Sequence, residues 1–453
     1  MIETQTNPQA PVPEAASHGR FRLLPELKRS ELWTYFGPAF VASVAYIDPG
    51  NFATNIDGGT RYGYRLLWVL LWSNAMAILI QYLSAKLGIV TGLTLPQNCR
   101  KTYSRGTNIF LWVAAEIAAL ATDLAEFLGA ALGFYLLFGP ALLGQGWSRT
   151  GVMFAAAMLT TVCVFLILAL DLAGFRFLEW GIMAFVGVIG ICYAIEIFLV
   201  HPDWKLAAFH ALVPSFDRAD LHGSIYVAVG MLGATVMPHV VYLHSALVQP
   251  RIKQATHRAG LPGRQFRSRY LSFELIDVFV AMNGAWLINS AMIIMAAGAF
   301  ASFAARGMAP VASIEDAHHT LGPLLGGISA TVFAVALLCS GLSSSTVGVM
   351  AGQVVLEGFL NVKFSIFLRR FLTIIPALVV IGLGLDPLKI LILSQVVLSF
   401  ALPFALVPLL LLTSRHDVMD SFANTKRTKY AGWLIVTIIV SLNALLLWQT
   451  FAR

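Results

Sequence analysis

Eleven apolar stretches, separated by short polar segments, constrain the fold of this chain more than any other feature. Each is long enough to cross a bilayer as a helix. With 58% hydrophobic and 12% charged residues, the chain is predicted to be an all-α integral membrane protein with eleven transmembrane helices. The stretches lie near residues 34–57, 66–92, 108–138, 150–171, 178–200, 224–248, 271–303, 324–358, 365–385, 387–413 and 431–451.

Polar segments divide the chain into three parts. We expect a cytoplasmic tail over residues 1–32, a core of helices 1–10 over 33–415, and a loop with helix 11 over 416–453. The tail lacks the short apolar segment of a secretory signal. Most of the 30 Lys and Arg residues fall on the same side as the N-terminus, six of them within 249–269. This bias predicts a cytoplasmic N-terminus and an outside C-terminus, and it explains the net charge of +7 without a nucleic-acid partner.

The first apolar stretch contains a carboxylate and two helix breakers at membrane depth, in the run Asp48-Pro49-Gly50-Asn51. Ionisable groups inside a bilayer are costly and are usually functional. A Pro-Gly pair opens the helix and frees backbone carbonyls that need partners. A bound cation would satisfy both the carboxylate and the carbonyls, so the sequence predicts an ion-binding site here.

The sixth stretch repeats this interruption, with Met237, Pro238 and His239 in mid-membrane. Two interrupted helices in corresponding positions, five helices apart, are typical of transporters with inverted repeats, whose substrate binds between the broken helices. Helices 1–5 and 6–10 would form the two repeats, with helix 11 appended.

The candidate ligands around the two breaks differ in chemical hardness. Asp48 supplies an anionic oxygen, Asn51 an amide oxygen and Met237 a thioether, and open backbone near Ala45 and Ala234 offers carbonyls. Ca²⁺ and Mg²⁺ prefer all-oxygen shells, so a sulfur ligand indicates a transition-metal dication. A structural alternative stays open, in which Asp48 caps the second half of helix 1 and Asn51 satisfies the open backbone.

Further polar groups lie on helices 3, 6, 9 and 10. Glu116, Asp123 and Glu126 share one face of helix 3 and could form either a proton relay or a structural network paired with arginine. The usual excess of basic residues on the cytoplasmic side explains the presence of at least one of Arg369 and Arg370. The other could turn toward these acids. The remaining candidates are His239, a possible proton carrier, His244, interpreted as a core histidine, and Gln395, interpreted as interhelical glue or a further ligand.

These motifs closely resemble those of the Nramp family of proton-coupled divalent-metal transporters. The run Asp48-Pro49-Gly50-Asn51 is similar to the family's helix 1 signature, and Ala234 through His239 to its helix 6 signature. The resemblance covers about residues 34–452. It implies a LeuT-like fold, a 5+5 inverted repeat, and import of Mn²⁺ or Fe²⁺, also Cd²⁺ or Co²⁺, with protons across a bacterial inner membrane.

The resemblance also assigns roles to matching residues. It implies metal ligation by Asp48, Asn51, Met237 and Gln395 and by the carbonyls of Ala45 and Ala234. It implies a proton path from Asp48 past His239 toward Asp123, Glu126 and an arginine at Arg370, to which we add Glu116. Because Met237 is present, the magnesium-transporting branch of the family is disfavoured.

Two other functions share some of these features. A sodium-coupled carrier of a small organic substrate could share the broken helices but would gain nothing from Met237. An intramembrane metalloenzyme would need a catalytic motif, whereas the sequence has no HExxH and the pair His318-His319 falls in a predicted outer loop. The chain is therefore expected to be no enzyme, to use no cofactor or nucleotide, and to need no obligate protein partner. Its four separated cysteines predict neither a disulfide framework nor a zinc site.

Overall fold

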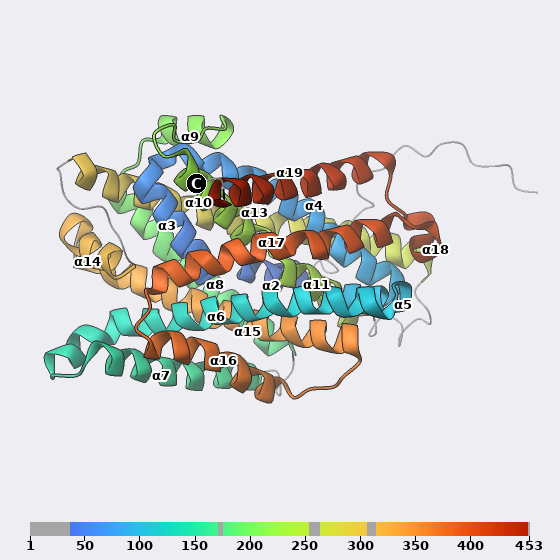
Figure 1. Cartoon of the computed structure of the whole chain (residues 1–453), viewed down its shortest axis with the longest axis horizontal. Coiled ribbons are helices and arrows are strands. Elements are labelled where there is room, and N and C mark those ends of the chain that lie inside the picture. The colour runs from blue at the N-terminus through green and yellow to red at the C-terminus, as the bar shows by residue number, and fades with distance from the viewer. Residues whose placement is uncertain (1–36, 171–174, 253–262, 306–313, 452–453) are drawn as a thin grey trace, which may run out of the picture.

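The structure, a computed structural model, describes residues 37–170, 175–252, 263–305 and 314–451 and is entirely helical in these ranges, without a strand. Most helices run along one axis of an elongated bundle (Figure 1). The expected tail over residues 1–32 lies outside the described residues, and the division of the chain into three parts stays a prediction.

The helices, in chain order, are α2 (Pro38–Ala45), α3 (Pro49–Tyr62), the 3-10 turn η1 (Gly63–Leu66), α4 (Leu67–Thr91), α5 (Leu95–Thr102), α6 (Arg105–Gly144), α7 (Arg149–Ala169), α8 (Phe175–Val200), α9 (Trp204–Leu212), α10 (Leu221–Thr235), α11 (Pro238–Leu247), α13 (Arg264–Ala305), α14 (Ile314–Leu325), α15 (Gly327–Leu360), α16 (Ile366–Gly382), α17 (Pro387–Ser414), α18 (His416–Met419), the 3-10 turn η3 (Asp420–Phe422) and α19 (Lys426–Phe451). The short helices α5, α9 and α14 connect long ones. Of these, α14 occupies the predicted outer loop with His318 and His319.

Both predicted interruptions are present. Helix 1 is divided into α2 and α3, and helix 6 into α10 and α11. Pro49 and Pro238 are the first residues of α3 and α11, where a missing N–H costs nothing. The residues before them, Asp48 and Met237, are extended, as a following proline favours. The sequence therefore sets both break points locally.

Nine helical runs in the described ranges are long and apolar enough to cross a membrane, judged by length and composition. One of these runs, Pro49–Thr91, joins α3, η1 and α4, and another, Leu221–Ile252, continues across the second break. The half-helix α2 and the 17-residue α16 are shorter than a complete span. The predicted number of eleven transmembrane helices is not confirmed.

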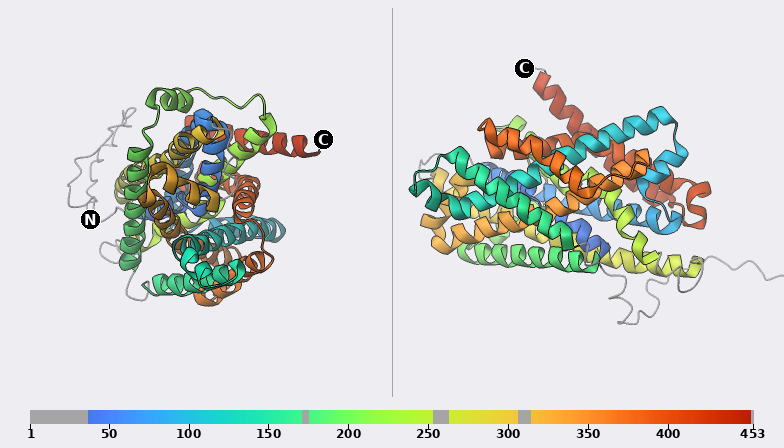
Figure 2. Two further views of the ribbon diagram at one scale, coloured as in Figure 1. Left: turned by 90° about the vertical axis from the view of Figure 1, so that its left-hand side faces the viewer. Right: turned by 90° about the horizontal axis from the view of Figure 1, so that it is seen from below.

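Small residues bring the central helices together. α6 packs along α15, and α2, α3, α11 and α17 also contact this pair. A side chain at Gly133 would overlap the backbone of Leu338, and one at Gly341 would overlap Ala130, so the two helices approach at backbone distance. The broken helices are thereby held against a rigid core, whereas α19 lies at the edge of the bundle (Figure 2).

The outer surface of the bundle is apolar. Large hydrophobic side chains are exposed along several helices, such as Leu166 on α7, Phe177 and Trp180 on α8, and Trp448 on α19. Apolar patches of this extent need a lipid environment. The structure thus agrees with the composition in placing the bundle in a membrane.

Candidate functional site

The Asp48 carboxylate lies at the first break and is completely buried. Its Oδ1 atom accepts hydrogen bonds from the backbone N–H of Asn51 at 2.8 Å and from Asn51 Nδ2 at 2.7 Å. The structural prediction that Asp48 caps α3 is therefore confirmed. Only one oxygen serves as the cap, because Oδ2 faces Gln395, whose Nε2 lies 3.4 Å away.

Two amides converge on this carboxylate. Asn51 Nδ2 also donates to the Ala234 carbonyl at 3.1 Å, which ties the first broken helix to the second. Gln395 packs against Gly50, where any side chain would overlap its amide. The amide oxygens of both, Asn51 Oδ1 and Gln395 Oε1, are buried and have no hydrogen-bond partner among the described residues. Buried oxygens without partners are costly, and they indicate room for a donor or a cation.

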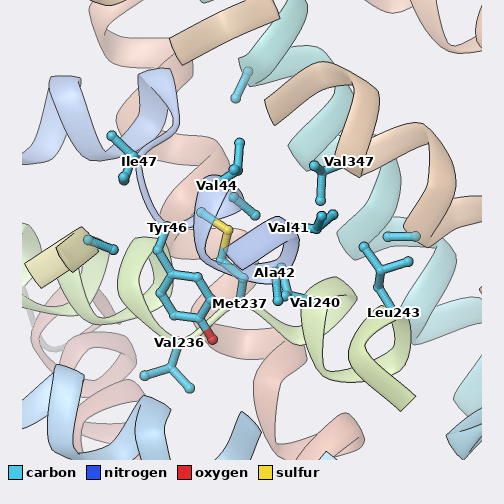
Figure 3. Close-up of a cluster of buried hydrophobic side chains, with 14 of the residues drawn as sticks. Val41, Ala42, Val44, Tyr46, Ile47, Val236, Met237, Val240, Leu243 and Val347 are labelled. Atoms are coloured by element: carbon cyan, nitrogen blue, oxygen red, sulfur yellow. The ribbon is translucent and has the colours of Figure 1, made fainter. Parts of the chain in front are cut away.

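Met237 belongs to the second break and is also completely buried. In Figure 3, its side chain reaches between Tyr46 and Ala42, beside Val44. These three residues come from the first broken helix, so the thioether is directed at the opposite break. Ala45 ends α2, and Ala234 lies one residue before the end of α10, which places both carbonyls at open helix ends.

The opened backbone of the first helix is partly satisfied by neighbouring helices. Asn289 of α13 donates to the Tyr46 carbonyl at 2.6 Å, and Ser340 of α15 donates to the Ile47 carbonyl at 2.5 Å. Neither residue was singled out from the sequence. Polar residues on apolar helices were the available signal, but their partners depend on tertiary packing.

His239 lies in the first turn of α11, and its ring faces α6. Its Nδ1 atom is 3.1 Å from the Thr122 hydroxyl, and its Nε2 atom lacks a hydrogen-bond partner in the part of the chain that the structure describes. Asp123 and Glu126 lie on α6 with Thr122, and both are completely buried. A side chain at Gly348 of α15 would overlap the Glu126 carboxylate and come within 3.0 Å of Asp123 Oδ1, so both acids converge on this glycine.

The two arginines of α16 both turn inward. Arg370 NH1 lies 3.8 Å from Asp123 Oδ1, and Arg370 also donates to Ser345 and lies over the Phe127 ring. Arg369 NH2 binds Glu116 Oε1 at 2.6 Å. The expectation that an arginine turns toward the acids of α6 is confirmed, and it holds for both residues, because both guanidinium groups are buried beside carboxylates.

A second buried polar chain was missed. Tyr46 OH accepts a hydrogen bond from Gln81 at 2.6 Å, Gln81 Oε1 lies 2.9 Å from His244 Nδ1, and His244 Nε2 lies 2.8 Å from Glu274 Oε1. The interpretation of His244 as a satisfied core histidine is confirmed. Glu274 and Asp277 could have been found, because two carboxylates three residues apart in an apolar stretch form the same pattern that singled out Asp123 and Glu126.

No group of three or more His, Cys, Asp or Glu residues in the described ranges is arranged to hold a metal. A cation at Asp48 would therefore depend on one carboxylate together with amide, thioether and carbonyl donors.

Comparison with known proteins identifies the family. A family model described as Natural resistance-associated macrophage protein-like matches residues 39–449. The chain belongs to this family, Nramp. A divalent metal cation transporter, MntH, of Caldanaerobacter subterraneus subsp. tengcongensis is 47% identical over 437 residues, which cover 96% of this chain and 98% of the relative. MntH of Deinococcus radiodurans is 48% identical over 92% of this chain and 89% of that protein.

Solved structures of other transporters resemble this chain as well. The manganese transporter of Eremococcus coleocola matches with a TM-score of 0.79 and 33% identity, over 93% of this chain and 87% of that one. MhsT in complex with L-phenylalanine matches with a TM-score of 0.61 at 15% identity, over 92% of this chain and 98% of that one, which shows the fold alone. This Nramp chain is a multi-pass membrane transporter with a LeuT-like fold and not an enzyme.

Proposed function

We propose that this Nramp chain imports divalent transition-metal cations, Mn²⁺ and Fe²⁺ with Cd²⁺ and Co²⁺ also accepted, together with protons. One observation gives the main support for the proposal. A buried carboxylate, Asp48, lies beside two buried amide oxygens without partners, on Asn51 and Gln395, at the junction of two broken helices. The names of the relatives, divalent metal cation transporter and manganese transporter, support it.

The donor set favours transition metals over alkaline earths. Asp48 Oδ2, Asn51 Oδ1 and Gln395 Oε1 offer hard oxygens, the carbonyls of Ala45 and Ala234 lie at open helix ends, and Met237 adds a soft sulfur. Ca²⁺ and Mg²⁺ gain little from a thioether, whereas Mn²⁺, Fe²⁺ and Cd²⁺ can use it. A single carboxylate leaves a dication half neutralised, which suits a site that must release its cargo.

The proton is proposed to leave Asp48 toward α6. Glu126 lies near enough to interact electrostatically with the carboxylates of both Asp48 and Asp123, and the free Nε2 atom of His239 belongs to the adjacent helix. Arg370 lies beyond Asp123. Carboxylate and histidine chains inside membranes serve as proton relays. When a dication binds Asp48, its charge would repel a proton from that carboxyl toward these acceptors, which couples the two movements.

Alternating access requires a closure on each side of the site. At the α2 end, Asp277 Oδ2 accepts from the backbone N–H groups of Gly37 and Ala39 at 3.2 and 3.0 Å, and Arg251 binds Glu179 at 3.1 Å. The Asp277 contacts hold the half-helix α2 in place, and the Arg251–Glu179 pair lies beside Gly37 at its start. Release to the cytoplasm would require α2 to leave Asp277, as one bundle moves against the other around the site.

The opposite end is closed by exposed ion pairs. Arg61, at the end of α3, binds Asp220, at the start of α10, at 2.8 Å, and Arg65 binds Asp217 at 2.6 Å. These pairs couple the outer halves of the two broken helices. The N-terminus is proposed to lie in the cytoplasm of a bacterial cell and the C-terminus outside the inner membrane. A negative-inside potential would then favour entry by about 2.3 kcal/mol per charge per 100 mV.

The sodium-coupled alternative has less support. The likeness to MhsT concerns the fold alone. The side chains bonded to the Asp48 carboxylate in the described residues are two neutral amides, Asn51 and Gln395, and neither supplies the positive charge that would bind the carboxylate of an organic substrate.

Uptake of Mn²⁺ into proteoliposomes with an inward proton gradient tests the proposed function. Wild type and Met237→Ala are compared with and without excess Ca²⁺. The variant should keep Mn²⁺ transport but lose discrimination against Ca²⁺, because only the soft ligand is removed. Met231→Ala, which removes another fully buried methionine from α10, is the matched control.

Equal discrimination by wild type and Met237→Ala would remove the thioether from the site. Absence of Mn²⁺ uptake by wild type under any gradient would overturn the proposed function itself. Mn²⁺ uptake that dissipates no proton gradient would overturn proton coupling while leaving metal transport in place.

A further inference from the structure

Glu196 is a buried acid that has no part in transport as described above. It lies on α8, and its exposed fraction is 1%. Its Oε2 atom accepts a hydrogen bond from the Ser329 hydroxyl of α15 at 2.6 Å, whereas its Oε1 atom is buried without a partner among the described residues. The carboxyl group thus joins two packed helices through one oxygen and leaves the other oxygen unsatisfied.

The other glutamate of α8 has a cationic partner, and Glu196 has none. Glu179 is bound by Arg251 at 3.1 Å. No Lys, Arg or His side chain bonds to Glu196 in the part of the chain that the structure describes. An unpaired carboxylate in an apolar interior is far more costly than a neutral carboxyl group. The position of Glu196 therefore favours the form that carries a proton.

Uncharged groups surround this carboxyl. The titratable side chains of the region are phenol or thiol groups, with Tyr193 and Cys192 on α8 and Cys339 of α15 near Cys192. The helices α2 and α13 also pack on α8. Of these, α2 has no titratable residue, and α13 has none in residues 278–305.

Charged residues of the adjoining helices bind one another. Arg149, at the start of α7, binds Glu315 of α14 at 2.6 Å, and Arg61 of α3 binds Asp57 at 3.5 Å. The other titratable residues of these three helices are Tyr62, Cys163, Asp316, His318 and His319. None of them bonds to Glu196 within the described ranges, so these helices supply no counter-charge to its carboxyl there.

A proton suits this site better than a metal cation does. Cations bound by oxygen atoms take about six or more ligands. The oxygens found beside the Glu196 carboxyl are the hydroxyl groups of Ser329 and Tyr193, and the Tyr193 hydroxyl is also buried without a partner in the described residues. Two hydroxyl groups and one carboxylate fall short of a cation's shell, whereas a proton needs only one oxygen.

The site lies close to one end of the bundle. Glu196 is four residues before Val200, the end of α8, which is about 6 Å along the helix axis. A side chain at Gly298 would overlap Val200 and lie 3.8 Å from the Tyr64 hydroxyl, so α8 ends beside η1. Arg65, also on η1, belongs to the exposed ion pairs that close the proposed outer end. A proton from outside therefore has a short path to Glu196.

Aromatic contacts connect the site to the first broken helix. The Tyr193 ring meets Phe52 of α3 edge to face, with centroids 5.5 Å apart. Phe333, one turn after Ser329 on α15, meets the same Phe52 ring at 6.2 Å. Phe52 directly follows Asn51. The two helices that Glu196 joins thus support the outer half-helix α3.

We propose that Glu196 is a reversible proton-binding site near the outer end of the bundle, separate from the acids of α6. While its carboxyl holds a proton, α8 and α15 pack without a buried charge and support α3. Loss of the proton leaves an unpaired carboxylate in this interface, which favours entry of water and looser packing of α3. The proton site is independent of the cargo, and only its effect on α3 rests on the proposed alternating access.

Infrared difference spectroscopy tests the proton site. The full chain in nanodiscs is moved between acidic and alkaline buffer, and the C=O bands of protonated carboxyl groups are followed. Wild type should lose a band in alkaline buffer that Glu196→Gln lacks in both buffers. Ser329→Ala removes a hydrogen bond from this carboxyl and should shift the band to higher frequency. Glu179→Gln is the matched control and should leave the band unchanged, because the Glu179 carboxylate is paired with Arg251.

Three results would overturn the site. Bands that are the same in wild type and in Glu196→Gln would show that Glu196 holds no proton. A Glu196 band that persists in alkaline buffer would exclude reversible binding. A carboxylate band of Glu196 that shifts when Na⁺ is added would assign the site to a cation instead.

Hydrogen exchange tests the effect on α3. After correction for intrinsic rates, segment 49–62 of wild type should exchange about tenfold faster in alkaline than in acidic buffer, because an unpaired buried charge is costly. Glu196→Gln stays neutral and should show no such change. Glu357→Gln, at an exposed position of α15, is the control and should behave as wild type does. An equal change in Glu196→Gln and wild type would overturn the link to α3. This measurement needs no metal uptake, so its failure is distinguishable from failure of the proposed function.

Discussion

Two buried polar regions meet at the first broken helix, and they differ in how completely their hydrogen bonds are made. Around Asp48, the amide oxygens of Asn51 and Gln395 have no partner among the described residues. In the chain from Tyr46 to Glu274, both ends of the Gln81 amide and both ring nitrogens of His244 are bonded, and among its side-chain atoms Glu274 Oε2, at the end of the chain, is without a partner in the described residues. Satisfied groups favour one rigid arrangement, whereas unsatisfied oxygens favour a guest.

The second region also shows where a proton is held. His244 Nδ1 faces the Gln81 oxygen, so it carries a hydrogen in this arrangement. The contact between His244 Nε2 and Glu274 Oε1 then contains a single hydrogen, either on the ring or on the carboxyl. A bond of this kind stabilises the protein without any ligand. The comparison predicts that the first region is needed for transport and the second mainly for stability.

The largest expected effect is that of Asp48→Asn. Asparagine can still accept the N–H of Asn51 and cap α3, so the fold should survive. Loss of the only carboxylate removes several kcal/mol of attraction for a dication, and Mn²⁺ uptake should fall by about a hundredfold or more. The measurement is uptake in proteoliposomes, with metal binding followed by calorimetry.

Glu274→Gln is the matched change in the satisfied region. It should lower the unfolding temperature but keep uptake within about threefold of wild type, since the Nε2 atom of a neutral His244 can accept a hydrogen bond from the new amide group. A comparable loss of uptake in both variants would end the distinction between the two regions.

Much of the first region could be predicted from the sequence. The positions of the two breaks depend on local sequence, because Pro49 and Pro238 each favour the start of a helix. Asp48 could be identified because a carboxylate at membrane depth is unusual. The acceptor of the Asn51 amide and the donors to the Tyr46 and Ile47 carbonyls could not be predicted. These partners, Ala234, Asn289 and Ser340, are 183 to 293 residues away. The sequence predicted that an arginine could pair with the acids of α6, but not that Arg369 is the partner of Glu116, for the same reason.

The second largest effect should be that of Glu126→Gln, which tests whether the acids of α6 carry protons. Transfer through a positioned carboxylate contributes substantially to proton movement, so proton flux should fall by about tenfold or more. Mn²⁺ affinity should change little, because Glu126 is not among the proposed ligands. Flux is measured with a pH-sensitive dye inside the vesicles.

Glu357→Gln, at an exposed position on α15, is the control for this experiment and should leave both quantities unchanged. If Glu126→Gln transports protons as wild type does, the acids of α6 do not carry protons. They are then structural partners of Arg370, like the groups of the second region.

A smaller effect is expected from Gly50→Ala. The added methyl group overlaps the Gln395 amide and must displace it, so one proposed ligand moves while Asp48 keeps its own bonds. Displacement of a single positioning group should weaken Mn²⁺ binding by about tenfold. Gly106→Ala meets only open space and is the control. Unchanged binding by Gly50→Ala would exclude Gln395 from the site.

The smallest effect concerns an exposed ion pair, in contrast to both buried regions. The Tyr62 hydroxyl and the Gly223 N–H donate to Asp220 at 2.8 and 3.0 Å, and together with the Arg61 guanidinium they lower the pKa of that carboxyl below its usual 3.8. Its contribution to stability is therefore complete above about pH 5 and is lost as the pH falls through the lowered pKa. Asp220→Asn keeps the helix cap, so it should destabilise the protein by at most about 1 kcal/mol at pH 7, since Asp220 and Arg61 are each nearly half exposed. Thermal unfolding measured from pH 7 down to pH 2 follows this difference, which should shrink as the pH falls below 3.8. A difference that is the same at both ends of this range would show that the aspartate acts through something other than its charge.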